Sequence, residues 1–127
     1  MKLEYYFDCL DGQYRFTGEL SEGVLFYNID SSIAEFESRQ GRLSNEDSEV
    51  FIRLLHRAGI EKWDERYEAQ GEGIEDAISW KVKLTDEEGS YVSQGEESFE
   101  PYGYEYLITA LKLCEEKADY FAAAGQR

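Results

Sequence analysis

The sequence predicts one α+β domain, a two-layer sandwich in which two helices cover one face of an antiparallel sheet. Alternation of apolar and polar residues, typical of half-buried strands, occupies the first thirty residues and residues 78–94. Apolar residues three and four positions apart, typical of helices, follow each of these segments. The length of 127 residues suits a single core, and 10 Tyr, 7 Phe and 2 Trp supply its apolar area.

The first third of the chain predicts a meander of three strands. Residues 3–9 and 14–20 are joined by Asp11-Gly12, a strong signal for a two-residue hairpin turn. Ser21-Glu22-Gly23 then leads into a third strand at residues 24–29. Residues 33–38 contain few apolar side chains, so we expect either an edge strand or a loop there.

The first helix is expected at residues 45–58. Ser44 is suited to the N-cap position, and Gly59 to a left-handed C-cap. The helix should cover the meander with the apolar stripe formed by Val50, Phe51, Leu54, Leu55 and Ala58.

The C-terminal half predicts a connection at residues 60–75, a second hairpin and a second helix. In the hairpin, Trp80 lies on the apolar side of its strand, and residues 86–89 form the turn. Pro101 is expected to open the last helix, and residues 122–127 to fray. The position of this hairpin relative to the meander is left open.

The charge of the chain bears on its partners and location. With 28 acidic residues against 13 Lys and Arg, the net charge of −15 disfavours nucleic acid as a partner. No run of 18 apolar residues predicts a membrane span, and acidic residues interrupt the apolar stretch in residues 1–10. We therefore expect a cytoplasmic protein, as a monomer or weak homodimer.

Catalytic and cofactor motifs are not recognised, so no catalytic, cofactor or metal residue is predicted. His56, the one histidine, falls off the apolar stripe of its helix and should be exposed. Cys9 and Cys114 fall on apolar faces; buried free thiols are expected, with a disulfide or a reactive thiol as the alternatives. Gly71-Glu72-Gly73 lacks the third glycine of a dinucleotide loop.

Acidic residues concentrate between residues 72 and 100, where nine acids accompany two lysines. Residues 86–89 fit a plain hairpin turn, with a weak calcium loop as the alternative. If a basic protein partner exists, its footprint is expected to include Asp86, Glu87, Glu88, Glu96, Glu97 and Glu100. Four tyrosines are candidates for surface exposure and thus for a protein interface, namely Tyr6, Tyr27, Tyr102 and Tyr106.

One pattern in the second half resembles a known group of proteins. It consists of W-x3-Y, then D-x3-W on an alternating strand, then Gly and Pro before an amphipathic helix, at Trp63, Tyr67, Asp76, Trp80, Gly95 and Pro101. This pattern resembles small uncharacterised proteins and lipoprotein domains of Firmicutes, although those carry Gly after the Asp, where this chain has Ala77. The resemblance implies a bacterial α+β domain and no activity.

The sequence therefore leads us to expect a non-enzymatic, acidic protein-binding domain, as an immunity or inhibitor protein of a basic partner. The alternatives are a carboxylate-based hydrolase, a weak calcium-binding protein and a structural module of a larger assembly. A further interpretation is that the charge only keeps the protein soluble.

Overall fold

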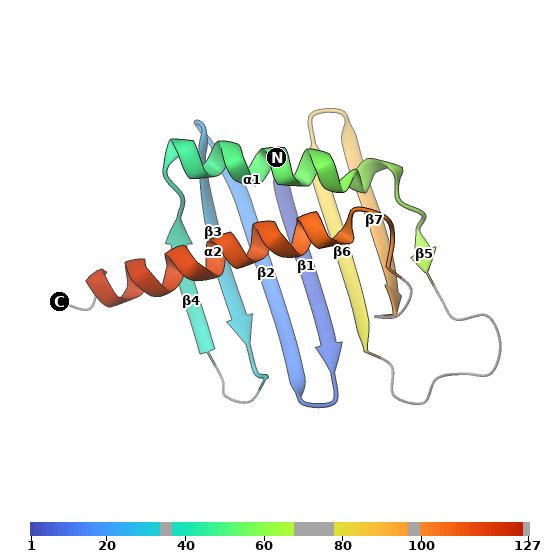
Figure 1. Cartoon of the computed structure of the whole chain (residues 1–127), viewed down its shortest axis with the longest axis horizontal. Coiled ribbons are helices and arrows are strands. Elements are labelled where there is room, and N and C mark those ends of the chain that lie inside the picture. Colours follow the sequence, from blue (N-terminus) through green and yellow to red (C-terminus); the bar gives the residue numbers. More distant parts are fainter. Residues whose placement is uncertain (34–36, 68–77, 97–99, 126–127) are drawn as a thin grey trace.

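The computed structural model describes residues 1–33, 37–67, 78–96 and 100–125, which form a sheet layer and a helix layer (Figure 1). Both helices lie on the same face of the sheet, and the α+β sandwich prediction is confirmed. The helices are α1 (Asn45–Ala58) and α2 (Tyr104–Gly125). The strands are β1 (Lys2–Cys9), β2 (Gly12–Ser21), β3 (Val24–Ser31), β4 (Glu37–Arg42), β5 (Arg66–Tyr67), β6 (Ser79–Asp86) and β7 (Gly89–Glu96).

The sheet has seven strands in the order β4-β3-β2-β1-β6-β7-β5. The N-terminal strand lies in its middle, because β1 pairs with β2 on one side and with β6 on the other. The second hairpin therefore extends the meander sideways, which the sequence had left open. Strand β5 has two residues and is parallel to β7, and the sequence did not predict it.

The first two turns are tight, as predicted, with one shift in position. The residues between β1 and β2 are Leu10 and Asp11, and Gly12 is already the first residue of β2, where its φ is 145°. The predicted Asp11-Gly12 turn is therefore displaced by one residue. Between β2 and β3, Glu22 and Gly23 both have positive φ, which suits the twist of a two-residue hairpin.

Two other predicted boundaries are corrected. Strand β4 begins at Glu37 rather than at residue 33, because its pairing with β3 extends into the polar segment that the apolar pattern did not mark; residues 34–36 lie outside the described part. Helix α2 begins at Tyr104, since Pro101 forms a turn in which its carbonyl accepts from the Tyr104 amide at 3.1 Å. Its backbone is helical to Gly125, and the fraying expected for residues 122–127 stays a prediction.

Helix α1 has the predicted boundaries because its local capping signals are strong. The Ser44 hydroxyl accepts a hydrogen bond from the Asp47 amide at 3.1 Å, and Gly59 has the left-handed conformation that ends the helix. Ser48, buried on its inner face, accepts from the Leu25 amide of β3 at 3.0 Å. Val50 does not belong to the buried stripe, because it is exposed.

The core lies between the sheet and the helices and is rich in aromatic rings. Trp80 is buried as predicted, and Trp63 packs against it at the end of α1. The exposure predicted for Tyr27 is wrong: it alternates in phase with Leu25 and Ile29, and all three face the core. Tyr6 and Tyr102 are exposed as predicted, and Tyr106 is half-buried. No helix in the described part of the chain is long and apolar enough to cross a membrane.

Candidate functional site

A groove of about 540 Å³ lies between α1 and the hairpin formed by β6 and β7. Its apolar surface comes from four elements that are distant in sequence. These are the start of the chain, the end of β2, helix α1 and the hairpin, which contribute Met1, Leu20, Ile52, Leu55, Leu84 and Tyr91. An apolar depression of this size accommodates one or two side chains of a partner.

Carboxylates line the same groove beside this apolar surface. Glu61 follows the C-terminal end of α1, and Asp86, Glu87 and Glu88 come from the hairpin tip. Glu87 and Glu88 are exposed at the turn between the two strands. The groove therefore combines an apolar surface with an acidic rim, and a basic side chain with a long methylene stem matches both parts.

The hairpin tip holds its shape through a side chain of its own. Asp86 Oδ1 accepts hydrogen bonds from the amides of Glu88 at 2.8 Å and Gly89 at 3.1 Å. This is the local bonding of an Asx turn, and it uses an oxygen that a calcium loop would direct toward the cation. In the described residues, no group of three His, Cys, Asp or Glu side chains is arranged to hold a metal ion.

The carboxylates of the rim act together on Tyr91. The pKa of this tyrosine is raised above its ordinary value, first by partial desolvation and then by three neighbouring negative charges. Those charges belong to Asp86, Glu88 and Glu61. Charges that destabilise a phenolate also stabilise a cation at the same place, so the rim is a site of negative potential.

The six acidic residues that the sequence marked as a footprint do not form one surface. The groove is lined by Asp86, Glu87 and Glu88. Glu96 lies at the opposite end of β7, and the rise of about 3.3 Å per residue in a strand places it about 23 Å away. Glu100 precedes α2 and lines a different depression, beneath that helix. Glu97 lies outside the described residues. Glu61 was not among the six predicted residues. It lies at the rim of the groove because the left-handed conformation of Gly59 turns the chain at the end of α1.

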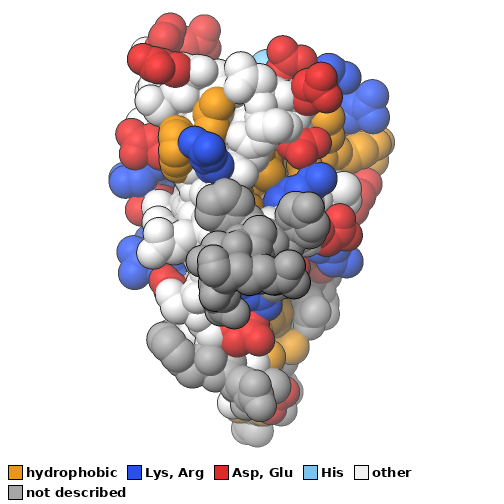
Figure 2. All heavy atoms as spheres, turned by 90° about the vertical axis from the view of Figure 1, so that its left-hand side faces the viewer, with side chains coloured by type: hydrophobic (Ala, Val, Ile, Leu, Met, Phe, Trp, Pro, Cys, Tyr) orange, Lys and Arg blue, Asp and Glu red, His pale blue; other side chains and the backbone are white. Residues whose placement is uncertain are grey.

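One face of the molecule carries side chains of both charges. Figure 2, which faces the β4 end of the molecule, shows acidic and basic side chains interspersed. The groove lies toward the other end, between α1 and the β6–β7 hairpin.

The remaining residues that the sequence singled out are His56 and the two cysteines. His56 is exposed, as predicted, and lies at the groove. Both cysteines are free: Cys114 is buried, and burial together with the Glu115 carboxylate raises the pKa of its thiol. Cys9 is only half-buried, which corrects its predicted burial, because it ends β1 beside the first turn.

Comparison with protein-family models and with curated proteins finds no match for this chain.

Proposed function

We propose that this chain is a non-enzymatic protein-binding domain whose groove between α1 and the β6–β7 hairpin receives a basic segment of a protein partner. The observation that carries the proposal is the combination of an apolar surface with four carboxylates in one groove. Arginine and lysine have an apolar stem and a charged end, and this groove offers a matching surface for each part.

The groove favours arginine or lysine over a purely apolar side chain for an electrostatic reason. A cation brought to the rim meets the charges that raise the pKa of Tyr91. The net charge of −15 would also attract a basic partner over a distance, which raises the rate of association more than it slows dissociation. The Tyr91 ring adds contact area with little loss of conformational entropy.

The biological form that we propose is an immunity or inhibitor protein of a basic partner, working in the bacterial cytoplasm as a monomer or weak homodimer. The resemblance to small Firmicutes proteins and the free thiols of Cys9 and Cys114 are consistent with that setting. A small acidic domain can neutralise a basic protein by occupying its positive surface.

A model peptide tests the groove directly. The probe is an N-acetylated, C-amidated peptide of two leucines and two arginines, compared with the same peptide in which citrulline replaces arginine. Citrulline keeps the shape of the side chain and removes its charge. In ¹⁵N-resolved spectra we expect shifts at the amides of residues 52–56 and 84–91, with affinity falling as salt rises. Equal binding of both peptides would overturn the proposal.

Charge reversal supplies the matched variants. The double change Glu87→Lys, Glu88→Lys alters the rim and leaves the Asp86 bonds of the turn in place. The control Glu105→Lys, Glu116→Lys makes the same change in net charge at exposed positions on α2, outside the groove. We expect the first pair to weaken arginine-peptide binding at least tenfold and the control less than threefold. Equal loss in both would mean that net charge alone attracts the peptide.

A further inference from the structure

The face of the sheet that the helices leave open has a different charge balance from the rest of the chain. By strand register, six of the 13 lysines and arginines lie on this face: Lys2, Arg15, Arg42, Arg66, Lys81 and Lys83. Only five of the 28 acidic residues do so within the described strands: Glu4, Asp8, Glu19, Asp30 and Glu96. A strongly acidic protein therefore has one face with a slight excess of positive charge.

Several of these cations lie in one row that crosses neighbouring strands. The register pairs Arg15 with Tyr6, Tyr6 with Lys81, and Lys81 with Gln94, and Arg66 of β5 completes the row. Adjacent members are about 4.8 Å apart, the spacing between strands. The Arg15 guanidinium lies 5.2 Å from the centre of the Tyr6 ring, and this stacking leaves its N–H edges available for a carboxylate.

A depression of about 720 Å³ lies along this row, and it also contains Glu96. The Oε2 atom of Glu96 is buried, yet among the described residues it has no hydrogen-bond partner. A buried carboxylate oxygen without a donor is costly, and folded proteins rarely leave one in that state. The same depression therefore holds a carboxylate to which the described residues give no donor at Oε2 and, two residues along the neighbouring strand, the cation of Lys81.

We propose that this depression binds a short peptide with free termini. The peptide carboxylate would lie on Lys81 and the stacked Arg15, and its terminal ammonium would donate to Glu96. Glu96 and Lys81 are one strand and two residues apart, so their backbones are about 8 Å apart. An extended dipeptide spans about 7 Å between its two charged ends, which is close to the separation of the points where these two side chains leave the sheet.

Ligands with one sign of charge fit the depression less well. A simple anion would satisfy Lys81 and leave the Glu96 oxygen without a donor, with Asp8 nearby as a further negative charge. A simple cation would meet Arg15 and Lys81. The site shares no residue with the groove between α1 and the hairpin, so this inference stands apart from the proposed function.

The test uses alanyl-leucine as the probe, with its N-acetylated and its C-amidated forms as comparisons. Binding is followed in ¹⁵N-resolved spectra through the amides of Lys81, Gln94 and Glu96 and the indole N–H of Trp80, which also lines the depression. We expect the dipeptide with free termini to bind at least tenfold more tightly than either blocked form. Equal affinities of the three forms, or no shifts with any of them, would overturn the proposal.

Two substitutions assign the two ends of the ligand. Lys81→Met should weaken binding of the free dipeptide at least fivefold and leave binding of the C-amidated form unchanged. Glu96→Gln should also weaken binding of the free dipeptide at least fivefold, but it should leave binding of the N-acetylated form unchanged. The controls Lys83→Met and Glu4→Gln lie on the same face but outside the depression, and they should change no affinity. A loss in the controls equal to that in the test variants would show attraction to the whole face and refute the site.

Discussion

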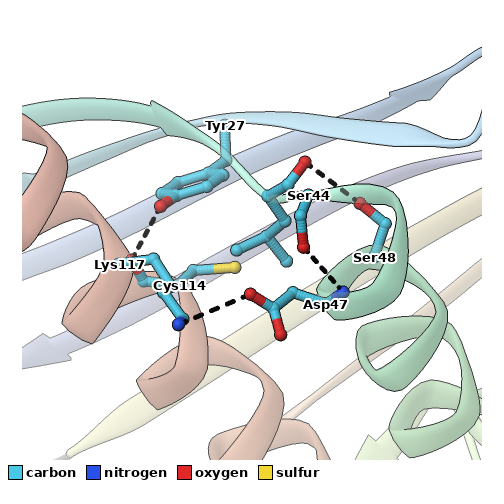
Figure 3. A network of polar contacts seen from close by, with 7 residues as sticks. Tyr27, Ser44, Asp47, Ser48, Cys114 and Lys117 are labelled. Atoms are coloured by element: carbon cyan, nitrogen blue, oxygen red, sulfur yellow. Dashed lines mark hydrogen bonds and ion pairs between the residues drawn. The ribbon is translucent and has the colours of Figure 1, made fainter.

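The hydroxyl of Tyr27 donates a hydrogen bond of 2.9 Å to the backbone carbonyl of Cys114, which ties the middle of β3 to the middle of α2 (Figure 3). Beside this bond, the Lys117 ammonium lies 3.5 Å from the Asp47 carboxylate and so links α2 to the first turn of α1. Two polar contacts thus fix the second helix relative to both the sheet and the first helix.

Removal of the Tyr27 hydroxyl should weaken this attachment without disturbing the ring. In Tyr27→Phe the aromatic contact with Phe16 remains, with ring centres 6.0 Å apart in the parent. We expect a loss of about 1 kcal/mol in the free energy of unfolding, the usual net worth of a hydrogen bond. Urea unfolding measures it, and Tyr102→Phe is the control because Tyr102 is 93% exposed. An unchanged midpoint for Tyr27→Phe would contradict the assignment.

Trp80 is expected to be the costliest single truncation in the core. Its ring contacts those of Trp63, Tyr67 and Tyr104, and only 2% of the residue is exposed. Trp80→Ala should lower the free energy of unfolding by about 3 to 5 kcal/mol, since it opens a cavity that its neighbours can fill only in part. Guanidinium unfolding followed by circular dichroism checks this value, and Tyr102→Ala should have little effect. A change below about 1 kcal/mol would mean that Trp80 is not a core residue.

Stability is expected to fall at alkaline pH. Burial, followed by the Glu115 carboxylate, raises the pKa values of Tyr14 and Cys114 in the folded protein. In the unfolded chain these groups lose their protons near about pH 10 and pH 8.5. Unfolding then releases protons, so the free energy of unfolding should decline as the pH rises above about 8.5.

The double variant Tyr14→Phe, Cys114→Ala serves as the control for this pH dependence. It lacks both groups and should lose less stability between about pH 7 and pH 10 than the parent does, as measured by urea unfolding. Identical declines in the two proteins would show that other groups cause the alkaline loss.

Gly103 is required where the start of α2 meets the end of α1. Its φ is 94°, and a Cβ atom there would lie 2.4 Å from the carbonyl oxygen of Ala58. Gly103→Ala should therefore destabilise the protein by more than about 1 kcal/mol. Gly89→Ala is the matched control, since Gly89 also has a positive φ, 153°, but no atom within 4 Å of its Cβ position. Thermal unfolding compares the two, and equal losses would exclude the Ala58 contact as the cause.

The sequence by itself determined the elements whose signals are local. Helix α1 has the predicted boundaries because Ser44 caps its start and Gly59 caps its end, each through a hydrogen bond to a residue nearby in sequence. The hairpin turns were predicted to within one residue, since the conformations they need favour glycine, asparagine and aspartate. Strand β4 was located less well: its pairing with β3, rather than an apolar pattern of its own, defines its ends.

Only the tertiary structure decided what lies next to what. Pairing of β1 with β6 joins residues about eighty positions apart, and no local pattern encodes that choice. The same pairing brings Leu20, Leu84 and the α1 residue Leu55 to one groove, and it aligns Arg15, Tyr6 and Lys81 in one row. Acidic residues close in sequence, such as Glu88 and Glu96, are separated because the extended strand β7 lies between them and places them at its opposite ends.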